Sequence, residues 1–127
     1  MKKFISFIIS MAIVLGTFPA LSVSVTATEF DGTAAGAYAG GTGTTDDPYQ
    51  ISTAGELKYA QQMINEGKDN DKAFILTADI DFNDQEWTPI GKDGGIFGGT
   101  FNGAGYKVSN LKITTVTPHV GFFGYTS

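Results

Sequence analysis

Oxygen-bearing side chains between residues 79 and 84 form the most chemically suggestive cluster in the sequence. Asp79, Asp81 and Asn83 occupy alternate positions, as the first oxygen ligands of a calcium-binding loop do. The rest of that motif is missing, because Asp84 stands where the loop needs glycine and Ile90 stands where it needs a bidentate glutamate. We therefore expect turn and strand-end roles for these residues, with weak calcium binding as the alternative.

Catalysis has little support from the other residue types. The chain has 13 acidic residues, so a carboxylate pair at the roughly 5–10 Å separation of glycosidases is always available and carries little information. The only histidine, His119, has no nucleophile motif beside it, so a surface role is the simpler interpretation. The absence of cysteine excludes disulfides and thiolate chemistry. We expect no catalytic residue, no cofactor, and no metal site beyond the calcium candidates.

Aromatic side chains offer a different chemistry, because Trp87, Tyr106 and Tyr125 could form a platform on which a sugar stacks. The alternative is that Trp87 packs over the end of the fold and the tyrosines lie in strands, where aromatic residues are favoured. We prefer this second interpretation. The glycine pairs at residues 94–95 and 98–99 lack the helix and the Lys-Ser/Thr pair of a phosphate loop, so we interpret them as tight corners.

The first residues of the chain predict export. Lys2 and Lys3 precede an apolar run at residues 4–18, and Val25-Thr26-Ala27 offers a small-residue cleavage site. We therefore predict a signal peptide at residues 1–27, a secreted or cell-surface location, and no stable membrane insertion after cleavage. The apolar run is shorter than the roughly 20 residues of a spanning helix, although an uncleaved N-terminal anchor is the alternative.

Charge restricts the partners of the exported chain. The whole chain has 8 basic and 13 acidic residues, and the basic residues are all lysine. Removal of residues 1–27 leaves 6 lysines against 13 acids, which is a formal charge of −7. Nucleic acids and anionic membrane surfaces are bound by clustered cations, which this chain lacks. We therefore expect no nucleic-acid partner.

One helix and several short strands must position these residues. Thr53 and Glu56 fit a capping box, which predicts a helix from Thr53 to Glu66 that stops at Gly67. Residues 28–45 are rich in Gly, Ala and Thr, so we predict a flexible leader there. The following list gives the residues that recur at helical spacing and define the buried side of the helix: Leu57, Ala60 or Gln61, and Ile64.

The second half of the chain has the pattern of short strands. Apolar residues alternate with polar ones from Phe74 to Phe82, and Asn110 is a natural left-handed corner. The pattern Gly-apolar-Phe-Gly-x-Thr occurs at residues 95–100 and again at residues 121–126, 26 residues later. A repeat of this length is typical of a solenoid, in which each coil packs only against its neighbours.

These segments resemble bacterial surface proteins of the GLUG-motif type. The motif itself is similar to Gly121, Phe122, Phe123, Gly124 and Tyr125, with Phe122 where leucine is usual. The other matching segments are residues 44–53, 56–57, 74–81, 87–91, 97–105 and 108–113. The resemblance implies a mainly β fold, namely a truncated right-handed parallel β-helix of the pectate-lyase-like kind with one N-terminal capping α-helix.

Domain organisation and function follow from this resemblance as expectations. Residues 46–127 are expected to form the cap and first coils of an incomplete β-helix, so the chain is the N-terminal part of a longer protein or a truncated product. We expect a non-catalytic surface module for adhesion, binding a host or matrix protein or a glycan. The alternative is a fragment of a larger carbohydrate-active enzyme or surface peptidase whose catalytic part is absent here.

Overall fold

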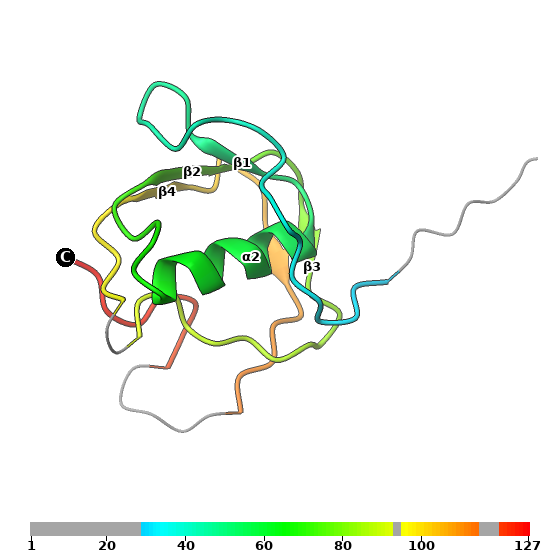
Figure 1. Ribbon diagram of the computed structural model, residues 1–127. Coiled ribbons are helices and arrows are strands. Elements are labelled where there is room, and N and C mark those ends of the chain that lie inside the picture. Colours follow the sequence, from blue (N-terminus) through cyan, green and yellow to red (C-terminus); the bar gives the residue numbers. More distant parts are fainter. Residues whose placement is uncertain (1–28, 93–94, 115–119) are drawn as a thin grey trace, which may run out of the picture.

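The computed structural model describes residues 29–92, 95–114 and 120–127, so the predicted signal peptide and His119 lie outside the described residues. The described part contains one helix and five short strands (Figure 1). In chain order they are β1 (Tyr49–Ile51), α2 (Ala54–Asn65), β2 (Ala73–Leu76), β3 (Ile80–Asp81), β4 (Thr100–Asn102) and β5 (Val108–Ser109).

The predicted helix is confirmed, together with its capping box. The Glu56 amide donates to Thr53 Oγ1 at 3.2 Å, and Glu56 Oε1 accepts from the Thr53 amide at 3.1 Å. The same carboxylate oxygen accepts from the Ser52 amide and hydroxyl at 2.7 and 2.8 Å. Four donors at the start of α2 are thereby satisfied by two acceptor oxygens within one turn. The helix ends at Asn65, one residue before the predicted Glu66, and the predicted stop residue Gly67 has a φ of +75° in the left-handed region.

One side of α2 covers the interior of the fold. The predicted positions at residues 57, 60, 61 and 64 are all buried, and Ala54 joins them. Figure 1 shows α2 lying across the space that the strands surround. The hydrophobic core beneath it consists of Ile51, Leu57, Ile64, Phe74, Leu76, Ile80, Phe82, Trp87, Ile90 and Phe97, with Ala54 and Ala60.

The strands form two small parallel sheets. One sheet has the order β1-β2-β4, in which Tyr49 pairs with Phe74, and Phe74 pairs with Phe101. The other sheet consists of β3 and β5, in which Ile80 pairs with Val108. Phe74 is the centre of the larger sheet, and its ring lies near those of Tyr49 and Phe101, at centroid distances of 5.7 and 6.2 Å. Parallel pairing of this kind needs long connections between neighbouring strands.

The predicted β-helix is wrong for the part of the chain that the structure describes. Its strands are two to four residues long, they form two separate open sheets, and neither sheet closes or continues as a solenoid. The two copies of the Phe-Gly repeat do not pair in equivalent positions, because Phe97 bridges Thr126 and not Phe123, while Phe123 bridges Ile90. The aromatic rings of the copies also meet, since Phe97 and Phe123 stack at 6.0 Å. A short motif repeated twice thus did not impose equivalent backbone positions.

The alternating run from Phe74 to Phe82 is divided between both sheets. Phe74, Leu76, Ile80 and Phe82 are buried as the alternation predicts, but the chain leaves β2 after Leu76 and enters β3 only at Ile80. Thr77 marks the departure, because its amide donates to the Ile51 carbonyl of β1 at 2.9 Å. One sequence pattern therefore supplies two layers of the core rather than one continuous strand.

Part of the predicted leader makes defined contacts with the core. Phe30 and Tyr38 pack against the core cluster, and the Phe30 and Phe82 rings lie 4.6 Å apart. Ala39 donates its amide to the Gln50 carbonyl at 2.9 Å, next to β1. The flexibility of residues 28–45 stays a prediction, but these two aromatic side chains belong to the packed interior.

The glycine corners are required by close backbone approach. A Cβ atom on Gly99 would collide with the Lys72 carbonyl oxygen, and one on Gly95 would lie 2.6 Å from Asn65 Cα. Neither glycine has a left-handed φ, so the constraint is the space for a side chain. Asn110 is the predicted left-handed corner, with φ +57°.

Candidate functional site

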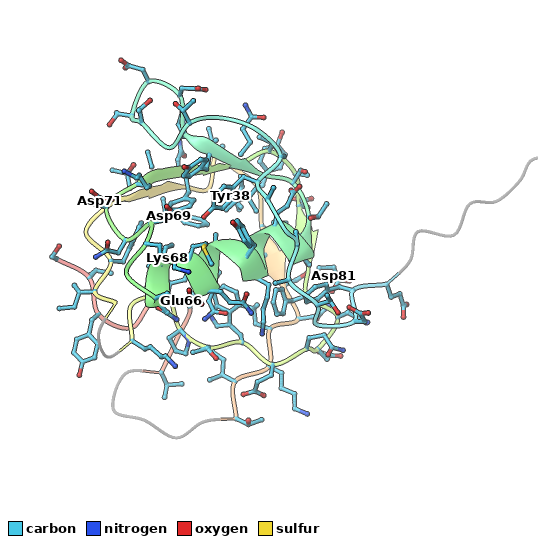
Figure 2. All side chains as sticks on the ribbon, viewed as in Figure 1. Tyr38, Glu66, Lys68, Asp69, Asp71 and Asp81 are labelled. Carbon is cyan, nitrogen blue, oxygen red and sulfur yellow. The ribbon has the colours of Figure 1, made fainter. Side chains whose placement is uncertain are left out.

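The three calcium candidates lie together beside the start of α2. Asp79, Asp81 and Asn83 line a cavity of about 450 Å³, together with residues 29–30 and 53–55. Figure 2 shows Asp81 near the first turn of α2, far from Glu66 and Lys68 at the other end of the helix. The sequence spacing thus did bring the candidates to one place.

Hydrogen bonds within the fold use the oxygens of these candidates. Asp79 Oδ1 accepts from the Lys107 amide at 3.0 Å, and Asp81 Oδ1 accepts from the Asn83 amide at 2.9 Å and from Asn110 Nδ2 at 2.8 Å. The hydrogen bond from Asn110 and then that from Asn83 hold the pKa of Asp81 below its ordinary value. Among residues 29–92, 95–114 and 120–127, no group of three acidic or imidazole side chains has the arrangement of a metal site. These are the turn roles that the sequence favoured, and calcium binding stays a prediction.

The three aromatic candidates do not form one platform. Trp87 is completely buried, whereas Tyr106 and Tyr125 are 45% and 38% exposed. The Trp87 ring packs edge-on against Phe82 at 5.3 Å and stacks on Phe122 at 4.9 Å, and its Nε1 donates to the Phe122 carbonyl at 3.2 Å. Trp87 therefore belongs to the core and is not available for stacking on a sugar.

The GLUG-like segment at residues 121–125 packs against the segment that follows Trp87. The Ile90 amide donates to the Phe122 carbonyl at 2.9 Å, and the Gly124 amide donates back to the Ile90 carbonyl at 2.8 Å. Tyr125 donates its amide to the Gly91 carbonyl at 2.6 Å. The Phe122 side chain is half-buried, while Phe123 is 38% exposed. The segment acts here as a structural element that closes over Trp87.

A second cavity, of about 360 Å³, lies between α2 and the segment at residues 88–92. Its volume falls within the range of small-ligand pockets. Every side chain that lines it is polar or charged. The lining residues are Lys58, Gln61, Gln62, Asn65, Glu66, Thr88 and Lys92.

Gln61 is the unusual member of this cavity. It is 5% exposed and is the one buried polar side chain on α2. Within the described part of the chain its amide has no hydrogen-bond partner, yet neither amide atom is sealed from solvent. A buried amide is ordinarily hydrogen-bonded. Its donors and acceptor are therefore free to meet a molecule in the cavity.

The two walls of the cavity are held together at both ends. Asn65 Nδ2 donates to the Pro89 carbonyl at 3.0 Å, and Asn65 Oδ1 accepts from the Gly91 amide at 2.7 Å and the Lys92 amide at 3.3 Å. At the other end, Lys58 Nζ donates to the Glu86 carbonyl at 3.4 Å. The helix and the segment are thus fixed relative to each other before any ligand arrives.

Sequence reasoning missed this cavity. Helical spacing predicts only that Ala60 or Gln61 lies on the buried side of the helix, and both are buried. The signal that could have found it is an amide side chain in an apolar stripe, because burial of an amide needs a partner. The other lining residues gave no such signal: Thr88 lies in the GLUG-like segment 87–91 and Lys92 follows it, but neither the resemblance nor the spacing indicates a cavity.

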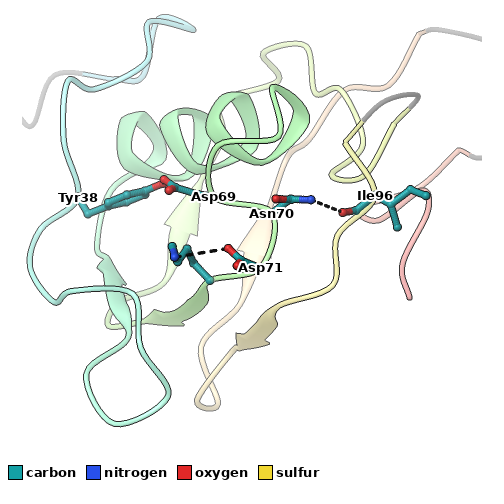
Figure 3. Close-up of polar contacts among 6 residues, drawn as sticks. Tyr38, Asp69, Asn70, Asp71 and Ile96 are labelled. Carbon is teal, nitrogen blue, oxygen red and sulfur yellow. Dashed lines mark hydrogen bonds and ion pairs between the residues drawn. The ribbon is translucent and has the colours of Figure 1, made fainter.

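Two other polar contacts hold the loop that follows α2. The Tyr38 hydroxyl donates to Asp69 Oδ2 at 2.7 Å, and Asn70 Nδ2 donates to the Ile96 carbonyl at 3.2 Å (Figure 3). Burial, and then the hydrogen bond to Asp69, raise the pKa of Tyr38 well above its ordinary value. The Tyr38 ring also stacks on Tyr49 at 4.1 Å. These contacts join the first residues of the described chain to the loop after α2.

Two longer proteins are similar in sequence to this chain. One is described as "Putative Gly-rich membrane protein" of Evansella cellulosilytica and is 36% identical over 94 residues, which cover 68% of this chain and 10% of that protein. The other is described as "Halomucin" of Haloquadratum walsbyi and is 34% identical over 112 residues, which cover 78% of this chain and 1% of that protein. The chain thus spans about a tenth and about a hundredth of their lengths.

No protein-family model matches the chain, and no solved structure matches it. None of the helices in the described residues is long and apolar enough to span a membrane, since α2 has 12 residues.

Proposed function

We propose that this chain is a non-catalytic module of an exported surface protein, which binds a matrix or glycan partner outside the cell. The observation that carries the proposal is its similarity to two proteins that are named as a membrane protein and as a mucin, over 68% and 78% of the chain. The predicted signal peptide and the resemblance to GLUG-motif surface proteins support the same location, and both stay predictions.

Binding is favoured over catalysis by how the polar side chains are used. Asp79 and Asp81, the candidate carboxylates from the sequence, accept hydrogen bonds from backbone amides of the same chain. By contrast, the cavity beside Gln61 combines free polar groups with fixed walls. Fixed, solvent-accessible polar groups serve recognition without requiring a reactive atom.

The proposal is tested in the organism that produces the protein. Antibodies against the chain should label intact cells, and deletion of its coding sequence should reduce adhesion of the cells to surfaces coated with matrix polysaccharide. Restoring the full-length protein should restore adhesion, with an unrelated exported protein as the control. Absence of labelling on intact cells, or unchanged adhesion after deletion, would contradict the proposal.

The same material tests the enzymatic alternative. The purified full-length protein is incubated with the coating polysaccharides, and newly formed reducing ends are measured. Under our proposal their number stays at the level of the buffer control. Release of reducing ends that increases with protein concentration would instead assign the protein to a carbohydrate-active enzyme.

A further inference from the structure

We infer that the cavity between α2 and residues 88–92 binds an acidic saccharide, that is, a sugar unit bearing a carboxylate or sulfate group. This inference rests on the proposed function and names the class of partner. It begins from Gln61, which is 5% exposed and whose amide has no hydrogen-bond partner in the part of the chain that the structure describes. Because the amide atoms still reach solvent, they can exchange contacts with water for hydrogen bonds to a molecule in the cavity.

The side chains around Gln61 match the hydroxyl groups of a sugar. A side-chain amide both donates and accepts, as a sugar hydroxyl does, and the cavity offers such groups from Gln61 and Gln62. Thr88 adds a hydroxyl on the opposite wall. A cavity of about 360 Å³ with several convergent donors and acceptors suits a molecule larger than a single inorganic ion.

Charge selects an acidic sugar over a neutral one. Lys58 and Lys92 both line the cavity, whereas its one acidic lining residue, Glu66, is paired with Lys68 at 2.7 Å outside it. The pKa of Glu86 is lowered chiefly by hydrogen bonds from Thr114, and to a smaller extent by Lys112 and then Lys58, so Glu86 also lies near Lys58. In a chain of net charge −5, two lysines that line one polar cavity favour an anion there, although Lys58 Nζ also donates to the Glu86 carbonyl at 3.4 Å.

The geometry is prepared in advance, which lowers the entropic cost of binding. Asn65 holds residues 89–92 against the end of α2 through three hydrogen bonds of 2.7–3.3 Å. Gly95 passes directly behind Asn65, where any Cβ would lie 2.6 Å from the Asn65 Cα. Rigid walls of this kind improve affinity because little ordering is needed when the ligand arrives.

The experiment measures binding by isothermal titration calorimetry with the full-length chain. The probes are an oligogalacturonide, which carries carboxylates, and dextran sulfate, which carries sulfates, against maltooctaose as a neutral saccharide and inorganic phosphate as a simple anion. We expect one or both acidic saccharides to bind, and maltooctaose and phosphate to bind at least about tenfold more weakly, since one charge-assisted hydrogen bond corresponds to roughly a tenfold change or more. The carboxylate and sulfate arms identify the acidic group.

Variants connect binding to the cavity. Gln61→Leu, which keeps the size but removes the amide, and Lys92→Met should each weaken the acidic probe about tenfold. Gln61→Glu is a second variant of matched shape, which should weaken it further through repulsion. Lys107→Met is the control, because Lys107 does not line the cavity. Thermal unfolding of every variant shows that folding is retained.

Three results would overturn the inference: no binding of either acidic saccharide, equal binding of maltooctaose or phosphate, or unchanged affinity in folded Gln61→Leu and Lys92→Met. The adhesion experiment separates this failure from failure of the proposed function. If cells carrying Gln61→Leu label and adhere like wild type, the partner binds elsewhere and only the inference is wrong. If deletion of the whole protein leaves adhesion unchanged, the proposed function itself is wrong.

Discussion

Trp87 is the side chain on which the packing of the GLUG-like segment depends most. It is completely buried, it is the only tryptophan, and it contacts Phe82 and Phe122 through its ring and the Phe122 carbonyl through Nε1. We predict that Trp87→Phe lowers the free energy of unfolding by about 2–3 kcal/mol, which is a large part of the roughly 5–15 kcal/mol of a typical domain.

The magnitude follows from two losses. The missing hydrogen bond from Nε1 costs about 1 kcal/mol, and not more, because the Phe122 carbonyl keeps its bond from the Ile90 amide at 2.9 Å. The smaller ring leaves part of the indole volume empty, which adds roughly 1–2 kcal/mol. Stacking on Phe122 survives in part, since phenylalanine retains an aromatic face. The same reasoning gives Trp87→Ala a cost of about 3–5 kcal/mol.

Urea unfolding followed by far-ultraviolet circular dichroism measures this effect, because the substitution removes the only tryptophan fluorophore. We expect a thermal midpoint lower by about 10–20 °C as well. Tyr106→Phe is the control, since Tyr106 is 45% exposed and should change stability by less than about 0.5 kcal/mol. A Trp87→Phe cost below about 1 kcal/mol, the hydrogen-bond term alone, would show that residues 121–125 do not depend on the indole ring as the structure indicates.

Three further predictions concern polar contacts. Glu56→Ala removes three hydrogen bonds at the start of α2 and should cost about 1–2 kcal/mol in urea unfolding; an unchanged midpoint would contradict a role for the capping box. Tyr38→Phe should cost about 1 kcal/mol at neutral pH, because the hydrogen bond to Asp69 is lost. Because the pKa of Tyr38 is raised, this contribution is present below the ordinary pKa of 10.0 and is lost as the pH rises beyond it. An ultraviolet titration that shows an ordinary tyrosine would argue against the contact. The pKa of Asp81 is lowered chiefly by the hydrogen bond from Asn110, so its contribution to stability is complete above the ordinary pKa of 3.8 and is lost as the pH falls below it. Asp81→Asn should therefore make stability depend less steeply on pH in that range. A pH dependence identical to that of the wild type would refute the assignment.

Local features of the fold could be predicted from the sequence. Neighbouring residue types are sufficient to predict features that depend on interactions within a few residues. These features are the capping box, the left-handed stop at Gly67 just after α2 and the left-handed corner at Asn110. The same holds for burial along the run from Phe74 to Phe82, because alternation places every second side chain on one side.

Pairing between distant segments could not be read in this way. The repeat at residues 95–100 and 121–126 predicted equivalent positions in a solenoid, but Phe97 bridges Thr126 and Phe123 bridges Ile90. Register between strands depends on corners and on the packing of large rings such as Trp87, which lie outside the repeated motif. The resemblance that suggested a β-helix therefore extended a local likeness further than the described strands allow.

The sequence alone determined the charge of the chain, the absence of thiol chemistry, the helix with its cap and the side of it that faces the core. Tertiary structure decided which polar groups remain free. The carboxylates of Asp79 and Asp81, which the sequence suggests as calcium ligands, accept hydrogen bonds from residues 83, 107 and 110. By contrast, the buried Gln61 side chain has no hydrogen-bond partner among the described residues. Whether a polar side chain has a hydrogen-bond partner depends on the groups around it, and those groups come from segments that meet only in the folded chain.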